Sequence, residues 1–186
     1  MTQENPARPT TAPAAAPVAP ATSPANATQS SENFLPQSTI LIVDDNAQNV
    51  ELLQAFLESM PVKLVTAVDG LYALQKVADH HPDLVLLEIM MPQMSGFQVC
   101  RRLKGDPKTR DIQVLMVTAL NELGDIEQAN ECGTDDFVSK PVNKIELLTR
   151  VKSLLRVRHL KSELERALTY LNEIEQDEEE TDGELL

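Results

Sequence analysis

The sequence is poor in aromatic residues and in positive charge. Phe, Tyr and Trp make up 3% of the 186 residues, Trp is absent, and the formal net charge is -13. An aliphatic core is therefore expected, whereas a surface that stacks nucleic-acid bases on aromatic rings is not. A strongly acidic chain also has no general electrostatic attraction to DNA or to an anionic membrane. We expect no direct DNA binding and no membrane partner.

Cysteines are equally scarce, and long apolar runs are missing. Cys100 and Cys132 have no metal-ligand spacing and no Cys-x-x-Cys arrangement, which is typical of two reduced thiols in a cytoplasmic protein. No stretch approaches the length of a membrane span, and the N-terminus lacks the charged region and apolar run of a secretory signal. The sequence thus predicts a cytoplasmic location.

Residues 1–37 differ in composition from the rest of the chain. Seven of the 12 prolines fall before residue 37, among many Ala, Thr and Ser. Such a segment cannot bury enough apolar area to offset the entropy that is lost on ordering. We expect a disordered, polyproline-like arm that serves either as a solubilising tether or as a docking segment.

Residues 38–156 alternate between two patterns. Short apolar runs bounded by polar turns indicate strands buried on both faces, and the segments between them repeat apolar residues at helical spacing. Short connections and right-handed crossovers then predict an α/β fold with a doubly wound, five-stranded parallel sheet and helices on both faces. The expected strands are 39–43, 63–67, 84–87, 114–117 and 137–139; a short helix is expected at 123–131 with Gly133 as its stop, and a last helix begins near Asn143.

Five polar residues fall just past the carboxyl ends of expected strands: Asp44, Asp45, Glu88, Thr118 and Lys140. Because these strand ends meet at one edge of a parallel sheet, the five side chains should share a pocket. Three converging carboxylates need a cation, and their hard oxygen atoms favour Mg²⁺. A lysine and a hydroxyl nearby suit a phosphoryl group. The pattern predicts a Mg²⁺-dependent site for phosphoryl chemistry.

Four motifs carry a resemblance to a known family. They are Ile-Leu-Ile-Val-Asp-Asp-Asn (40–46), Pro-Asp-Leu-Val-Leu-Leu-Glu-Ile-Met-Met-Pro-Gln-Met-Ser-Gly (82–96), Val-Thr-Ala (117–119) and Lys-Pro (140–141). On these motifs residues 38–158 resemble the receiver domain of two-component response regulators, which has a flavodoxin-like, chemotaxis-type fold. The resemblance implies a histidine kinase or a phosphotransfer protein as the upstream partner, and an effector protein downstream.

The resemblance also implies a Mg²⁺ site. Asp44 and Asp45 would hold the ion together with the carboxylate at position 88, and the main-chain carbonyl of Met90 would be a further ligand.

A switch is implied as well. Thr118 and Lys140 would contact the phosphoryl oxygens, and Phe137 lies three residues before the lysine, where the family has an aromatic switch residue. Thr118 and Phe137 would then couple the pocket to the face formed by the fourth helix, the fifth strand and the fifth helix, as a two-state element.

Glu88 departs from the family pattern. It occupies the position of the aspartate that accepts phosphate, and its extra methylene moves the carboxylate outward by about 1.5 Å. Because phosphoryl transfer depends on positioning, we expect a poor acceptor. Three interpretations remain open: Glu88 imitates a phosphorylated aspartate, it leaves the receiver inactive, or it is phosphorylated slowly. Imitation would be partial, since a carboxylate has less charge and fewer oxygens than a phosphoryl group.

The last helix is longer than a receiver requires. Beyond the residues that pack on the sheet, apolar residues continue at heptad spacing over residues 157–176, which predicts a coiled-coil dimer. The alternatives are a lone amphipathic helix or a stub that leads to an absent output domain. Residues 177–186 are expected to form an acidic, disordered tail, which either stays solvated or folds back on the basic part of the helix. The dimer seam consists of Val157, Leu160, Leu164, Ala167, Leu171 and Ile174.

The sequence therefore favours a signalling module that relays its state through protein contacts, and not an enzyme. A Mg²⁺-dependent phosphohydrolase with an acidic nucleophile would need a general acid and a cap over the substrate, and the sequence shows neither. A vestigial receiver that acts as a constitutive oligomerisation scaffold is the other alternative.

Overall fold

The computed structural model describes residues 37–119 and 131–183, with side-chain exposure described as far as residue 174. The proline-rich arm and most of the helix expected at 123–131 lie outside the described residues. The described elements belong to one compact unit, residues 35–186. In chain order they are β1 (Ser38–Val43), α1 (Ala47–Leu57), β2 (Val62–Ala67), α2 (Gly70–His80), β3 (Leu84–Leu87), α3 (Gly96–Gly105), β4 (Gln113–Thr118), β5 (Asp136–Ser139) and α5 (Lys144–Gly183).

The five strands form one sheet in the order β2-β1-β3-β4-β5, and every neighbouring pair is parallel. The chain therefore reverses its direction of progress across the sheet after β2, which is the doubly wound arrangement. The predicted fold class and the five predicted strands are confirmed. In such a sheet a site forms at the carboxyl ends of the strands next to this reversal, here β1 and β3.

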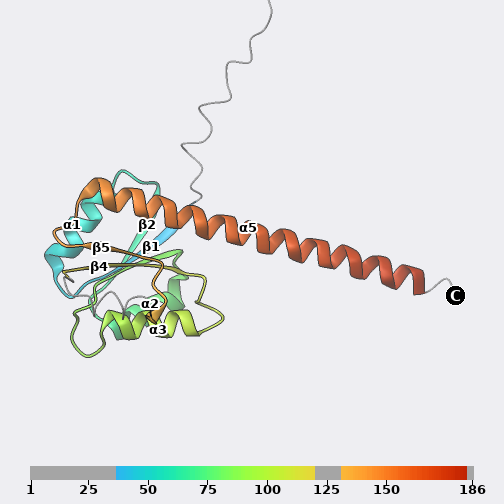
Figure 1. Cartoon of the computed structure of the whole chain (residues 1–186), viewed down its shortest axis with the longest axis horizontal. Helices are drawn as coiled ribbons and strands as arrows, with labels where there is room; N and C mark the ends of the chain where they lie inside the picture. Colours follow the sequence, from blue (N-terminus) through green and yellow to red (C-terminus); the bar gives the residue numbers. More distant parts are fainter. Residues whose placement is uncertain (1–36, 120–130, 184–186) are drawn as a thin grey trace, which may run out of the picture. The chain divides into compact units, whose positions relative to one another are not determined.

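The sheet separates two apolar cores, because successive residues of a strand point to opposite faces. On one face Leu41, Val85 and Met116 pack with residues of α2 and α3, and on the other face Ile40, Leu86 and Leu115 pack with residues of α1 and α5. Figure 1 shows α1 and α5 on one side of the strands and α2 and α3 on the other. The strand residues in these two cores are apolar and none is aromatic, in agreement with the scarcity of aromatic residues.

The described helices begin at side chains that accept a backbone hydrogen bond, and Asn143 does so at the start of α5. Asn46 caps α1 and Asp69 caps α2, while Ser95 and Gln98 form a reciprocal capping box at the start of α3. Such caps satisfy backbone N–H groups that have no partner inside the helix. They fix the points at which the chain leaves the strand ends and enters a helix, and so they position the loops around the site.

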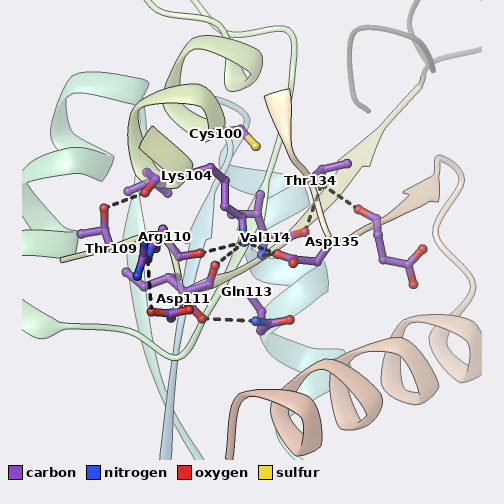
Figure 2. A network of polar contacts seen from close by, with 12 residues as sticks. Cys100, Lys104, Thr109, Arg110, Asp111, Gln113, Val114, Thr134 and Asp135 are labelled. Carbon is purple, nitrogen blue, oxygen red and sulfur yellow. Dashed lines mark hydrogen bonds and ion pairs between the residues drawn. The ribbon is translucent and has the colours of Figure 1, made fainter. Parts of the chain in front are cut away.

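Lys104 connects the end of α3 to the amino ends of two strands (Figure 2). The Nζ atom of Lys104 donates to the carbonyl oxygen of Ile112 at 2.8 Å and to that of Arg110 at 3.3 Å, and it pairs with Asp135 at 2.5 Å. Asp135 also accepts from the backbone N–H of Val114 at 2.7 Å. One side chain thus ties the end of α3 to the beginnings of β4 and β5.

The structure describes two helix ends for which the sequence makes a prediction. Gly133 has φ +81°, the left-handed conformation of a helix stop, as predicted. The last helix continues to Gly183 instead of ending at residue 176, so residues 177–183 are helical and not the disordered tail that was expected. Glu is a good helix former, and this explains why an acidic run extends the helix. In the described part of the chain, no helix is long and apolar enough to cross a membrane.

Gly96 brings the start of α3 against the backbone of Glu88. A Cβ atom at position 96 would lie 2.3 Å from the carbonyl oxygen of Glu88, whereas at Gly105 it would meet nothing within 4 Å. Because backbone atoms cannot move aside cheaply, Gly96→Ala should lower the free energy of unfolding by about 2 kcal/mol or more. Gly105→Ala, the matched control, should leave it unchanged or raise it by up to about 1 kcal/mol. Urea denaturation measures both, and equal effects would contradict the close approach.

Candidate functional site

The parallel ladder continues past the strand ends and aligns the site residues. The backbone N–H of Asp44 donates to Ala67 at 3.2 Å, and that of Glu88 donates to Val43 at 2.9 Å. On the other side of the site, the N–H of Lys140 donates to Thr118 at 2.8 Å. Asp44, Glu88, Thr118 and Lys140 are therefore held at one edge of the sheet by main-chain hydrogen bonds, as the sequence predicts.

Asp44 is the most enclosed carboxylate of the site, with 2% of its surface exposed. Its Oδ1 accepts from the backbone N–H of Asn46 at 2.8 Å, and both oxygens accept from the Nδ2 of Asn49, at 3.1 and 3.0 Å. The first turn of α1 thus orients the carboxylate. Sequence reasoning missed Asn49; the available signal was an amide in the first turn of the helix that starts immediately after Asp44-Asp45-Asn46.

Glu88 is also buried, with 7% of its surface exposed, and its carboxylate folds back over its own loop. Oε1 accepts from the backbone N–H of Ile89 at 2.7 Å and from that of Met90 at 3.1 Å. Oε2 pairs with the Nζ of Lys140. The extra methylene therefore leaves both oxygens of Glu88 engaged, one with the backbone that follows it and one with the lysine.

Lys140 lies between the two buried carboxylates. Its Nζ donates to Oδ2 of Asp44 at 2.8 Å as well as to Glu88, and 20% of its side chain is exposed. Burial alone lowers the pKa of Lys140, but the hydrogen bonds to Asp44 and Glu88 outweigh it and raise the pKa above its ordinary value of 10.5. Lys140 is therefore the cation that allows two carboxylates to lie together in this pocket.

The predicted metal ligands are brought together only in part. Asp45 is exposed at the rim, and Met90 is 75% exposed. Among residues 37–119 and 131–183, no group of three or more acidic, His or Cys side chains is placed to hold a metal ion. Carboxylate oxygens of Asp44 and Glu88 do converge on one point, and such oxygens suit a hard divalent ion. In this structure the ammonium group of Lys140 occupies that point.

Thr118 and Phe137 do not take part in the network around Glu88. Thr118 is 3% exposed, and its Oγ1 has no hydrogen-bond partner within the described ranges. A buried hydroxyl without a partner is costly, so the pocket holds a donor for which Glu88 supplies no acceptor. The ring of Phe137 is 43% exposed and is not enclosed in the core.

A comparison with known proteins identifies the family to which this site belongs. Residues 40–152 match the model of the response regulator receiver domain. The chain belongs to this family. The response regulator PleD of Caulobacter vibrioides is 47% identical over 125 residues, which make up 67% of this chain and 28% of PleD. The polar-differentiation response regulator DivK of Brucella ovis is 35% identical over 117 residues, which make up 63% of this chain and 95% of DivK.

A solved receiver has the same fold. The signal receiver domain of a signal transduction histidine kinase from Syntrophus aciditrophicus aligns with a TM-score of 0.61 and 36% identity, over 64% of this chain and 90% of that chain. The chain spans little more than a quarter of the length of PleD, so the likeness to that protein concerns the receiver alone. The receiver assignment made from the sequence motifs is confirmed.

Removal of the lysine should expose the dependence of the pocket on its positive charge. In Lys140→Met, Asp44 and Glu88 stay buried without a cation, so the free energy of unfolding at neutral pH should fall by about 2 to 4 kcal/mol. Lys108→Met, which removes an exposed lysine outside the site, should change it by less than about 0.5 kcal/mol. Urea denaturation followed by circular dichroism gives both values.

The pH dependence provides a second check on the same variant. A raised pKa means that the folded state binds the proton of Lys140 more tightly than the unfolded state does. The stabilisation is therefore complete below the ordinary pKa of 10.5 and is lost as the pH rises through the higher folded value. The difference between wild type and Lys140→Met should accordingly shrink at alkaline pH, and a difference that grows there would contradict the ion pair.

Proposed function

We propose that this chain is a response-regulator receiver module that relays a signal through protein contacts, and that Glu88 makes it phosphorylation-defective. The observation that carries the proposal is the position of the Glu88 carboxylate. Both its oxygens are already engaged, one by the loop amides and one by Lys140. An attacking oxygen must approach phosphorus in line at about 3 Å. A carboxylate held in this way is a poor nucleophile toward a phosphoryl donor.

The contacts of Thr118 and Phe137 favour a defective receiver over a constitutively active one. An imitation of phosphoaspartate requires an acceptor oxygen for Thr118 as well as for Lys140. Glu88 reaches only the lysine, and within the described residues Thr118 Oγ1 stays without a partner. The exposed ring of Phe137 agrees with a switch that has not closed. Imitation thus remains incomplete.

Family membership supports the proposed partners. A histidine kinase or a phosphotransfer protein would contact the site edge, and a downstream effector would recognise the surface that responds to it. Receiver domains typically bind Mg²⁺ at their acidic site. Here Asp44, Asp45, Glu88 and the carbonyl of Met90 would hold the ion, which would supply positive charge to a phosphoryl group. Lys140 would first have to release at least one of its two carboxylates.

The second half of α5 supports a homodimer. Six apolar side chains beyond the receiver are between 37% and 60% exposed, and most of them follow the predicted heptad seam. A second copy of the chain would cover this seam as in a coiled coil. These side chains are Val157, Leu160, Leu164, Leu168, Leu171 and Ile174.

A phosphorylation assay tests the proposed defect. With acetyl phosphate and Mg²⁺, the wild-type chain should take up no stable label, whereas Glu88→Asp should be labelled, because the shorter side chain frees the carboxylate from the loop. Intact-mass spectrometry detects the added phosphoryl group. Glu88→Gln serves as the control for labelling elsewhere. Stable labelling of wild type that disappears in Glu88→Gln would overturn the proposal.

A spectroscopic comparison tests the state of the switch without a known partner. Amide and methyl NMR shifts around Thr118 and Phe137 are recorded for wild type and for Glu88→Asp, the latter with and without acetyl phosphate and Mg²⁺. The wild-type shifts should coincide with those of unphosphorylated Glu88→Asp, because Thr118 lacks an acceptor in both. Shifts that coincide with the phosphorylated form would show that Glu88 imitates phosphoaspartate.

A further inference from the structure

The exposed seam of α5 lies on a different face from the one that binds the sheet. Leu147, Val151 and Leu155 pack into the core with α1 and the strands. At 3.6 residues per turn, the stripe that starts at Val157 lies well around the helix from this buried face. A second helix can therefore lie along α5 without displacing the sheet. In Figure 1, α5 continues beyond the strands as one uninterrupted helix.

The spacing of the seam assigns a heptad register. Val157, Leu164 and Leu171 occupy a positions, and Leu160, Ala167 and Ile174 occupy d positions. The apolar residues fit two parallel helices, with a facing a and d facing d. They fit two antiparallel helices equally well, since Val157 then faces Ile174, Leu160 faces Leu171, and Leu164 faces Ala167 of the other copy. Apolar packing alone does not choose between the two orientations.

The charged residues beside the seam distinguish the parallel orientation from the antiparallel one. Arg156 and Asp177 occupy g positions, and Lys161 and Asp182 occupy e positions. In parallel coiled coils each g residue lies beside the e residue of the next heptad in the partner. Arg156 would then lie beside Lys161, and Asp177 beside Asp182. Both contacts join like charges, and symmetry forms each of them twice.

The antiparallel arrangement removes both like-charge contacts and forms one contact between opposite charges. There g positions lie beside g positions, so that Arg156 of each copy lies beside Asp177 of the other. Lys161 lies beside Leu168, where its aliphatic stem covers an apolar side chain. At larger scale, residues 173–182 contain seven acidic and no basic residues, whereas residues 150–166 contain six basic and two acidic ones. Antiparallel helices place each acidic end along the basic part of the partner, and parallel helices place the two acidic ends together.

We propose that a second copy of this chain binds the α5 seam in antiparallel orientation, with the acidic end of each helix lying against the basic segment of the other. The inference rests on the proposed dimer and adds its orientation. Each helix end would then approach the receiver of the partner, near Lys152 and Arg156 on α5. The two receivers of such a dimer lie at opposite ends of the helix pair.

Cysteine cross-linking distinguishes the two orientations. Val157→Cys alone forms a disulfide between copies only if the helices are parallel, whereas a mixture of Val157→Cys and Ile174→Cys chains forms a mixed disulfide only if they are antiparallel. Mild oxidation of the full chains, one of them carrying a size tag, should yield the mixed product and no Val157→Cys homodimer. Wild type is the background control, because Cys100 and Cys132 are buried.

Charge reversal provides an independent measurement with opposite expected signs. Arg156→Glu should weaken the dimer by about five-fold or more in Kd if the helices are antiparallel, and should strengthen it if they are parallel. The double variant Arg156→Glu with Asp177→Arg should restore the affinity. Arg166→Glu makes the same charge change at a c position away from the seam, so it should have a smaller effect. Analytical ultracentrifugation at low and moderate salt gives the dissociation constants.

Each outcome has a defined meaning. Val157→Cys homodimers, or a tighter dimer with Arg156→Glu, would overturn the antiparallel orientation and leave the dimer standing. A monomer at all concentrations, by light scattering, would overturn the dimer and the orientation together. Neither result bears on the phosphorylation defect, because that is measured at Glu88 by labelling and lies in a different part of the chain.

Discussion

The ion pairs of Lys140 are the interaction on which the pocket depends. Asp44 and Glu88 are almost fully buried, and two such carboxylates repel each other unless a cation lies between them. Lys140 reaches both from the end of β5, while the strands that carry the acids are β1 and β3. The lysine thus joins the two inner strands β1 and β3 to the outermost strand β5. The loops after three strands therefore share one electrostatic arrangement, and we expect a change at position 88 to affect all of them.

Glu88 determines which hydrogen bonds are satisfied in this pocket. The proposed role of the site is to take up a phosphoryl group, to which the hydroxyl of Thr118 would respond. Here the side chain of the acceptor position satisfies the lysine by itself and leaves Thr118 without an acceptor among the described residues. The pocket is therefore complete in charge but incomplete in hydrogen bonding. This combination agrees with the proposed phosphorylation defect at Glu88.

The sequence predicted most of the fold because parallel strands buried on both faces produce runs such as Ile40–Val43 and Leu84–Leu87, which few other structures explain. It also predicted that Asp44, Glu88 and Lys140 meet, because the ends of such strands converge at one edge. Contacts that depend on the direction of a side chain could not be predicted from the sequence. Asn49 on Asp44, the return of Glu88 onto the amides of Ile89 and Met90, and the exposure of Phe137 follow from rotamers, which spacing does not encode. The end of α5 was missed for another reason: acidic composition suggests disorder, yet glutamate favours a helix that has already begun.

The close approach of Gly96 to Glu88 has a consequence for how this site can evolve. The backbone at position 88 is fixed from both sides, by its hydrogen bond to Val43 and by the start of α3 against its carbonyl group. The length of the side chain can therefore change while the main chain stays in place. Glutamate and aspartate codons differ only at their third base. A single point mutation can thus shorten the side chain at position 88, and the main chain around it already has the hydrogen bond and the close packing that hold it in place.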